Sequence, residues 1–100
     1  MQTAFVEAIR TKRLIRVTYE GQRRTAEPHV LGTRGEGNSF QVLAFQLTND
    51  ADRLAGPGWR YFLLSKIESF EVLDSTFHGR RVTRSYQPSQ WKWIAAVVAP

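Results

Sequence analysis

Two cations stand near the ends of one apolar stretch of the chain, residues 59–67, which reads Trp-Arg-Tyr-Phe-Leu-Leu-Ser-Lys-Ile. The stretch predicts a strand, and residues six apart in a strand lie on the same face. We therefore expect Arg60 and Lys66 on one sheet face, about 20 Å apart by strand rise. A face with two cations and apolar side chains between them indicates a binding site for an anion.

Further polar side chains are candidates for the same site. His29, on an extended segment, is either a structural histidine or a donor to an anion. Tyr19, at the end of the first strand, is either a core tyrosine or a group that stacks on a base. Arg34, beside a turn, is either solvated or functional. Gln41 and Gln46 stand on opposite faces of an otherwise apolar strand, and because a buried amide must be paired, one of them is expected to face a polar cavity.

The sequence shows no convincing set of catalytic residues. Ser39 or Ser65 could be combined with His29 and Glu27, but no nucleophile elbow surrounds either serine. The glycines of residues 32–37 lack the lysine-serine pair and the following helix of a phosphate loop, so they indicate a hairpin turn. There is no cysteine and there are only two histidines. We therefore expect neither an enzyme, nor a metal site, nor a cofactor.

Composition favours one domain with a modest core, because the chain has 100 residues of which 42% are hydrophobic. The net charge of +5 is uneven: residues 1–34 and 78–100 each carry +4, and residues 35–77 carry −3. Most cations are arginine, whose planar fork suits phosphate. Without a signal-peptide pattern or an apolar run of about 20 residues, the sequence predicts a soluble, cytoplasmic protein with no membrane partner.

The C-terminal part mixes cations with aromatic residues. The group consists of Arg80, Arg81, Arg84, Tyr86, Trp91, Lys92 and Trp93. Such a mixture suits single-stranded nucleic acid, whose bases stack on rings while its phosphates meet cations. The alternative is an arm whose tryptophans pack onto the body of the domain while its arginines stay in water.

Hydrophobic periodicity predicts a short helix followed by five strands. Thr3 is the expected N-cap of the helix, and Phe5, Ala8 and Ile9 form its apolar face. The expected helix spans residues 3–12, and the expected strands span residues 13–20, 23–33, 39–48, 59–65 and 68–74. Residues 20–22 and 32–37 are expected to form turns.

This order predicts a mainly β fold, a small five-stranded barrel of SH3-like (Sm-like) or OB-like type with a short N-terminal helix and an irregular C-terminal arm. We expect residues 1–77 to form the barrel with its helix, and residues 78–100 to form a basic and aromatic extension. In the tail, Pro88 could open a helix, whereas the spacing of Trp91 and Trp93 suits a strand, so both alternatives stay open.

Several short motifs, taken in chain order, resemble those of the WYL domain, an SH3-like barrel of bacterial regulators. The motifs are Ala8-Ile9, Tyr19, Arg24 with Glu27-Pro28, Ser39 to Phe45, Arg60 to Ile67, and Val72-Leu73. The resemblance covers residues 5–77. It does not include the N-terminal helix-turn-helix that is usual in this family. The chain has Phe40-Gln41-Val42 where the family is named for Trp-Tyr-Leu.

The resemblance implies a stand-alone ligand-sensing module in transcription regulation, which binds a nucleotide or single-stranded nucleic acid on a basic patch. The main site residues it implies are Tyr19, His29, Arg60 and Lys66. Gln41 and Arg34 are secondary candidates. It is compatible with a homodimer or a separate DNA-binding partner protein. The alternative is a protein-interaction or self-association module without a small ligand, suggested by the apolar end at residues 94–99 and the paired tryptophans.

Overall fold

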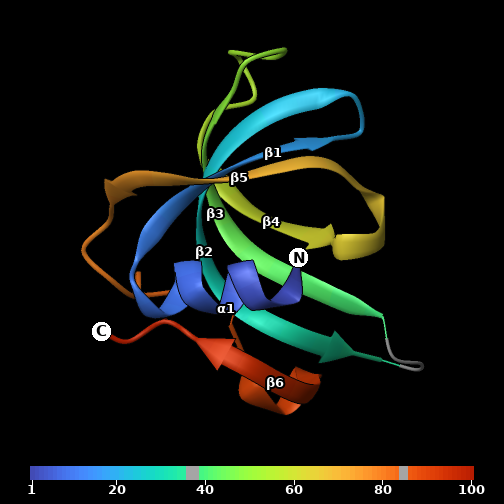
Figure 1. The fold of residues 1–100 in the computed structure, drawn as a ribbon, viewed down its shortest axis with the longest axis vertical. Coiled ribbons are helices and arrows are strands. Elements are labelled where there is room, and N and C mark those ends of the chain that lie inside the picture. Colours follow the sequence, from blue (N-terminus) through green and yellow to red (C-terminus); the bar gives the residue numbers. More distant parts are fainter. Residues whose placement is uncertain (36–38, 84–85) are drawn as a thin grey trace.

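One short helix and six strands make up the described part of the chain, which a computed structural model gives for residues 1–35, 39–83 and 86–100 (Figure 1). The elements are α1 (Gln2–Arg10), β1 (Arg13–Tyr19), β2 (Gln22–Arg34), β3 (Phe40–Asn49), β4 (Gly58–Leu63), β5 (Ile67–Thr76) and β6 (Trp91–Val97), with the 3₁₀ turns η1 (Leu64–Lys66) and η2 (Pro88–Gln90). The prediction of a mainly β fold with a short N-terminal helix is confirmed. Residues 36 and 37 of the predicted turn and Arg84 of the C-terminal group lie outside the described residues, whereas residues 32–34 belong to β2 and were wrongly assigned to that turn.

Helix α1 buries the apolar face predicted for it. Phe5, Ala8 and Ile9 are fully buried in the main core, which a nine-residue helix needs because it is too short to be stable alone. The predicted N-cap is wrong: the helix begins at Gln2, Met1 is the cap, and no side chain caps the end. No helix in the described ranges is long and apolar enough to cross a membrane.

Strands β1 and β2 form a hairpin with a two-residue turn, as predicted. Glu20 and Gly21 both have positive φ angles, 55° and 71°, and Tyr19 lies opposite Gln22. Positive φ at both central residues is the type I′ geometry that matches strand twist. The predicted alternation of β1 is also found, since Ile15 and Val17 are buried.

The long strand β2 organises the sheet. The strand order is β4-β3-β2-β1-β5, with β6 added to β2. Strand β1 pairs with Gln22–Ala26 and β6 pairs with Val30–Arg34, so these two strands lie end to end along one edge of β2, and β3 occupies the other edge. The described strands form an open antiparallel sheet, because β4 and β5, at its two ends, do not pair with each other.

The expected strand over residues 59–65 is too long at its C-terminal end. Strand β4 ends at Leu63, and the chain turns through η1 before β5 begins at Ile67. The turn buries Leu64 and connects two strands at opposite ends of the sheet order. Arg60 and Lys66 therefore do not share one strand face, and the expectation of a two-cation strand is wrong.

The predicted irregular arm is interrupted near its end. Pro88 opens a 3₁₀ turn, and residues from Trp91 to Val97 form β6. Of the two alternatives left open for the tail, the strand is the one found. The reason is tertiary, because β1 covers only the first half of its edge of β2 and leaves the second half open for β6.

Apolar side chains pack on both sides of the sheet. The inner face carries the main core beneath α1, including Leu31, Val42 and Phe62. The outer face, on the other side of β2, β3, β4 and β6, carries a smaller cluster. Its members are Val30, Leu43 and Trp91, with Trp59, Tyr61, Tyr86 and Ile94 packed against them.

Candidate functional site

The structure places Tyr19 in the core rather than in a site. Its side chain is 8% exposed and packs edge-on against Phe62, with ring centroids 5.0 Å apart. Its hydroxyl accepts a hydrogen bond of 3.2 Å from the backbone N–H of Leu63. Of the two readings given for this residue, the core tyrosine is the one found.

Arg60 and Lys66 are also separated from the other candidates. Arg60 lies opposite Ala44 on the side of β4 that carries the buried Phe62, and its Nη1 donates to the carbonyl of Trp59 at 2.9 Å. Lys66 is exposed at the end of η1. Because the two cations lie on different elements and faces, they do not form the predicted floor of a site.

His29 is buried beneath the segment that follows β5. It is 2% exposed, stacks on Phe77 at 5.4 Å and meets the edge of Trp59 at 4.8 Å. Nδ1 lies 2.9 Å from the carbonyl oxygen of Glu27, and Nε2 accepts the N–H of Arg81 at 3.3 Å. These contacts require the neutral imidazole with its proton on Nδ1.

Desolvation is the main cause that lowers the pKa of His29 below its usual value, and nearby Arg81 and Arg80 lower it further. The hydrogen bond to the Glu27 carbonyl and the Glu27 carboxylate act in the opposite direction. With both ring nitrogens engaged, His29 is the structural histidine of the two alternatives and offers no donor to a ligand.

An ion pair that the sequence did not reveal holds the C-terminal arm. Arg81 donates through Nε to Oε1 of Glu27 at 2.7 Å and through Nη2 to Oε2 at 3.0 Å. This bond raises the pKa of Arg81. The guanidinium also lies 3.9 Å from the ring centroid of Phe45. The sequence offers one indication of this contact: an acid, Glu27, lies on an expected strand, and the C-terminal arm is rich in arginine.

A groove of about 360 Å³ opens beside this ion pair. Its lining consists of Leu14, Glu27, Leu47, Thr76, Phe77, His78, Gly79, Arg80 and Arg81. Arg81 is already neutralised by Glu27, and Arg80 donates through Nε and Nη2 to the carbonyl of Val98. In this groove Arg81 is therefore neutralised, whereas Arg80 keeps its positive charge, because the carbonyl oxygen that accepts its hydrogen bonds is neutral.

Arg34 and Gln41 are the two predicted site residues that share the outer face. The Arg34 guanidinium lies 4.0 Å from the ring centroid of Tyr61 and 5.7 Å from that of Trp91. Gln41, half-buried on β3, lies between Gly32 of β2 and Leu63 of β4. The other amide of this strand, Gln46, is the buried one; its Oε1 accepts from Arg24 at 3.3 Å on the inner side.

The charge of Arg34 is not balanced by a carboxylate in residues 1–35, 39–83 and 86–100. Its one hydrogen bond there joins Nη2 to Oε1 of Gln90 over 3.4 Å. Its Nε is buried without an acceptor, and so is Nε1 of Trp91. Arg34 is thus a cation held by aromatic rings and a neutral amide.

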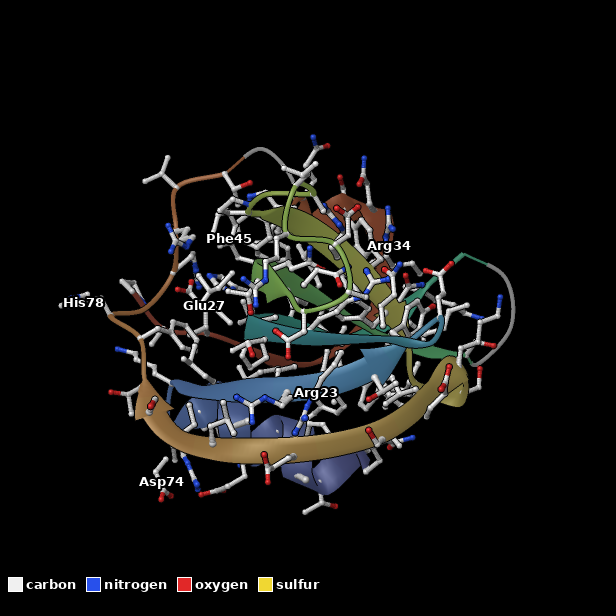
Figure 2. The ribbon with its side chains drawn as sticks, turned by 90° about the horizontal axis from the view of Figure 1, so that it is seen from above. Arg23, Glu27, Arg34, Phe45, Asp74 and His78 are labelled. Carbon is white, nitrogen blue, oxygen red and sulfur yellow. The ribbon has the colours of Figure 1, made fainter. Side chains whose placement is uncertain are left out.

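Aromatic rings connect Arg34 and Arg81 across the outer face. Phe45 meets Trp59 at 5.3 Å, Tyr61 follows two residues later on β4, and Tyr61 lies 6.3 Å from Trp91. We call Phe45, Trp59, Tyr61 and Trp91 the outer aromatic face. Figure 2 shows Arg34, Phe45 and Glu27 on the far side of β2 from α1.

Comparison with protein families, with curated proteins and with solved structures found no match to this chain. Among the described residues, no group of three or more histidines and acids gathers as metal ligands. The described residues of the outer face offer a cation, aromatic surfaces and N–H donors, which are groups that can bind an anionic or aromatic ligand.

Proposed function

We propose that this protein binds an anionic ligand with aromatic bases, a nucleotide or a short single-stranded nucleic acid, on the outer aromatic face. The observation that carries the proposal is Arg34, held 4.0 Å from the ring of Tyr61 with no carboxylate partner in the described part of the chain. An arginine placed in this way can meet a phosphate at little cost in ordering its side chain.

The row of rings supplies the second element of recognition. Phe45, Trp59 and Tyr61 are half-buried residues, so this row of aromatic residues is only partly covered. Bases stack on such rings with little sequence preference, and each stacked base contributes about 1–3 kcal/mol. A positively charged protein, here +5, also attracts a polyanion over a distance.

The proposal extends to the fold family and its role. We propose that the curved sheet is an SH3-like module of the WYL type, acting as a regulatory ligand sensor. The order of one helix and five successive strands, followed by a sixth that joins β2, supports this assignment. The ligand surface differs from that implied by the resemblance, because it uses Arg34 and Gln41 but not Tyr19, Arg60 or Lys66.

Fluorescence anisotropy of a labelled single-stranded oligonucleotide at low salt tests the function. We expect saturable binding that weakens as salt rises, and we expect Arg34→Gln to weaken it about tenfold, equivalent to roughly 1.4 kcal/mol. Arg10→Gln is the matched control, because it removes the same charge from the exposed end of α1, on the other side of the sheet. Absence of binding at low salt, or equal losses in the two variants, contradicts the proposal.

Self-association through β6 is a second candidate function. Trp93 and Val97, two apolar side chains on this strand, are 55% and 38% exposed. Light scattering over a range of concentrations measures the mass, and Trp93→Gln should then shift a dimer toward monomer. A wild-type protein that stays monomeric throughout removes this candidate.

A further inference from the structure

Two neighbouring N–H donors on the outer face lack acceptors. Arg34 and Trp91 are cross-strand partners on β2 and β6. Arg34 Nε and Trp91 Nε1 are both buried without an acceptor in the described residues, and the Trp91 side chain is only 7% exposed. A buried donor left without a partner costs about 1–3 kcal/mol, so two of them side by side call for an explanation.

Gln90 occupies the position next to these donors. Its Oε1 accepts from Nη2 of Arg34 over 3.4 Å, a long and therefore weak hydrogen bond to a neutral oxygen. Gln90 is exposed at the end of η2, immediately before Trp91. Its Nε2 also donates to Oε1 of Gln87 at 3.3 Å, on the exposed surface. A rotation of the Gln90 side chain into solvent breaks only these two long hydrogen bonds and opens the edge of the Arg34 guanidinium.

We propose that Arg34 and Trp91 together bind one phosphate group of the ligand, with the Gln90 amide taking the place of a phosphate oxygen in the free protein. This proposal rests on the proposed function and names the contact that its anion makes. A phosphate suits the donors because it is charged and offers several oxygens, so it can accept from two N–H groups that need not converge on one point.

The stacking contact favours the same ligand. Tyr61 lies 4.0 Å from the guanidinium carbon, which fixes the plane of the guanidinium and leaves its edge for in-plane hydrogen bonds. A neutral acceptor such as a base carbonyl would satisfy one donor but would leave the charge of Arg34 unbalanced. The phosphate satisfies both requirements at once.

Indole N–H signals in nitrogen-15 NMR spectra provide the test. The chain has three tryptophans, so Trp91→Phe assigns the Trp91 signal by its disappearance. We expect inorganic phosphate and adenosine monophosphate to shift the Trp91 signal, and we expect adenosine, which lacks the phosphate, to leave it in place. The signal of the exposed Trp93 serves as the internal control.

Two conservative variants measure the contribution of the donors. Trp91→Phe keeps an aromatic ring and removes the N–H, and should weaken adenosine monophosphate binding at least about fivefold. Gln90→Glu places a carboxylate beside Arg34 and should compete with the phosphate to a similar extent. Because Gln90 is exposed, this second variant stays informative if Trp91→Phe does not fold. Gln2→Glu, on α1, is the control for the added charge.

The outcomes separate this proposal from the function on which it rests. Nucleotide binding with an unmoved Trp91 signal, and with wild-type affinity in Gln90→Glu, overturns the phosphate contact but leaves the proposed function standing. A Trp91 shift with inorganic phosphate, but no binding of either adenosine monophosphate or the oligonucleotide, supports the phosphate contact and overturns the proposed function. A Trp91 signal that no probe moves overturns the proposal.

Discussion

Arg81 donates hydrogen bonds to both carboxylate oxygens of Glu27, at 2.7 and 3.0 Å. This ion pair holds the start of the C-terminal arm against the outer surface of β2. The pairing is asymmetric, since the Glu27 side chain is 8% exposed and that of Arg81 is 43% exposed. Removing the arginine would therefore leave a buried carboxylate without its partner, while removing the acid would leave a cation that water can reach.

A double-mutant cycle measures this ion pair. We expect Glu27→Gln and Arg81→Gln to show a coupling energy of about 1–2 kcal/mol in urea denaturation, less than a fully buried pair because water screens Arg81. Arg13 and Asp74 form the matched control pair at 3.1 Å, with Asp74 fully exposed. Their coupling should be clearly smaller, because water screens the exposed Asp74, and equal couplings in the two cycles would contradict the role given to Glu27.

Stability should depend on pH through His29. Its folded-state pKa is lowered by burial, so below about pH 6.5 the unfolded chain binds a proton that the folded protein does not. The free energy of unfolding should therefore fall as pH drops below about 6.5. Below the pKa of His29 in the folded protein, this histidine should cause no further fall. Urea midpoints measured between pH 8 and pH 5 report the slope.

Two histidine variants assign that slope. His29→Gln should flatten it, whatever the variant's stability at neutral pH. His78→Gln, which replaces the exposed histidine, is the matched control. A slope retained in the first variant would show that other groups carry the pH dependence.

Gly32 is required where β6 meets β2. A Cβ at this position would lie 2.1 Å from the carbonyl oxygen of Trp93 and 3.0 Å from the Trp91 ring. Gly32→Ala should therefore cost about 2–3 kcal/mol of stability in urea denaturation and weaken oligonucleotide binding by displacing Trp91. Gly58→Ala is the control, because its Cβ would meet only the flexible end of Arg60, and it should cost less than about 1 kcal/mol.

Tyr19→Phe separates the core from the site. The variant removes the hydroxyl that accepts from the Leu63 N–H, and should lower stability by about 1 kcal/mol. Oligonucleotide affinity, measured by anisotropy, should stay within about twofold of wild type, because Tyr19 lies on the inner face. A large loss of affinity in a folded Tyr19→Phe protein would return this residue to the ligand site.

The elements that the sequence predicted well are those with a local signal. Ile15 and Val17 alternate with polar residues in β1, and Glu20 with Gly21 marks the turn, so the first hairpin could be placed from neighbouring residues alone. Within the stretch at residues 59–67, the middle residues 61–64 are apolar on both faces. Its hydrophobic pattern does not predict that the strand breaks at Leu64, where the chain turns to pass from β4 to β5.

The site was harder to predict because its members meet through the pairing of distant strands. Arg34 contacts Trp91 only because β6 pairs with the part of the β2 edge that β1 leaves open. The hydrophobic periodicity of neither strand predicts that contact. The same holds for Glu27 and Arg81. His29 and Tyr19 are polar residues on strands, and whether such residues face a ligand or a core depends on what packs over them.

The end-to-end placement of β1 and β6 along β2 also has a consequence for folding. Strand β1 pairs with a segment that follows it almost immediately in the chain, whereas β6 must return to β2 from the far end of the sequence. Loop-closure entropy makes the first pairing fast and the second slow. We expect the hairpin to form early and β6 to dock late, so that the ability to bind phosphate emerges as one of the last events of folding.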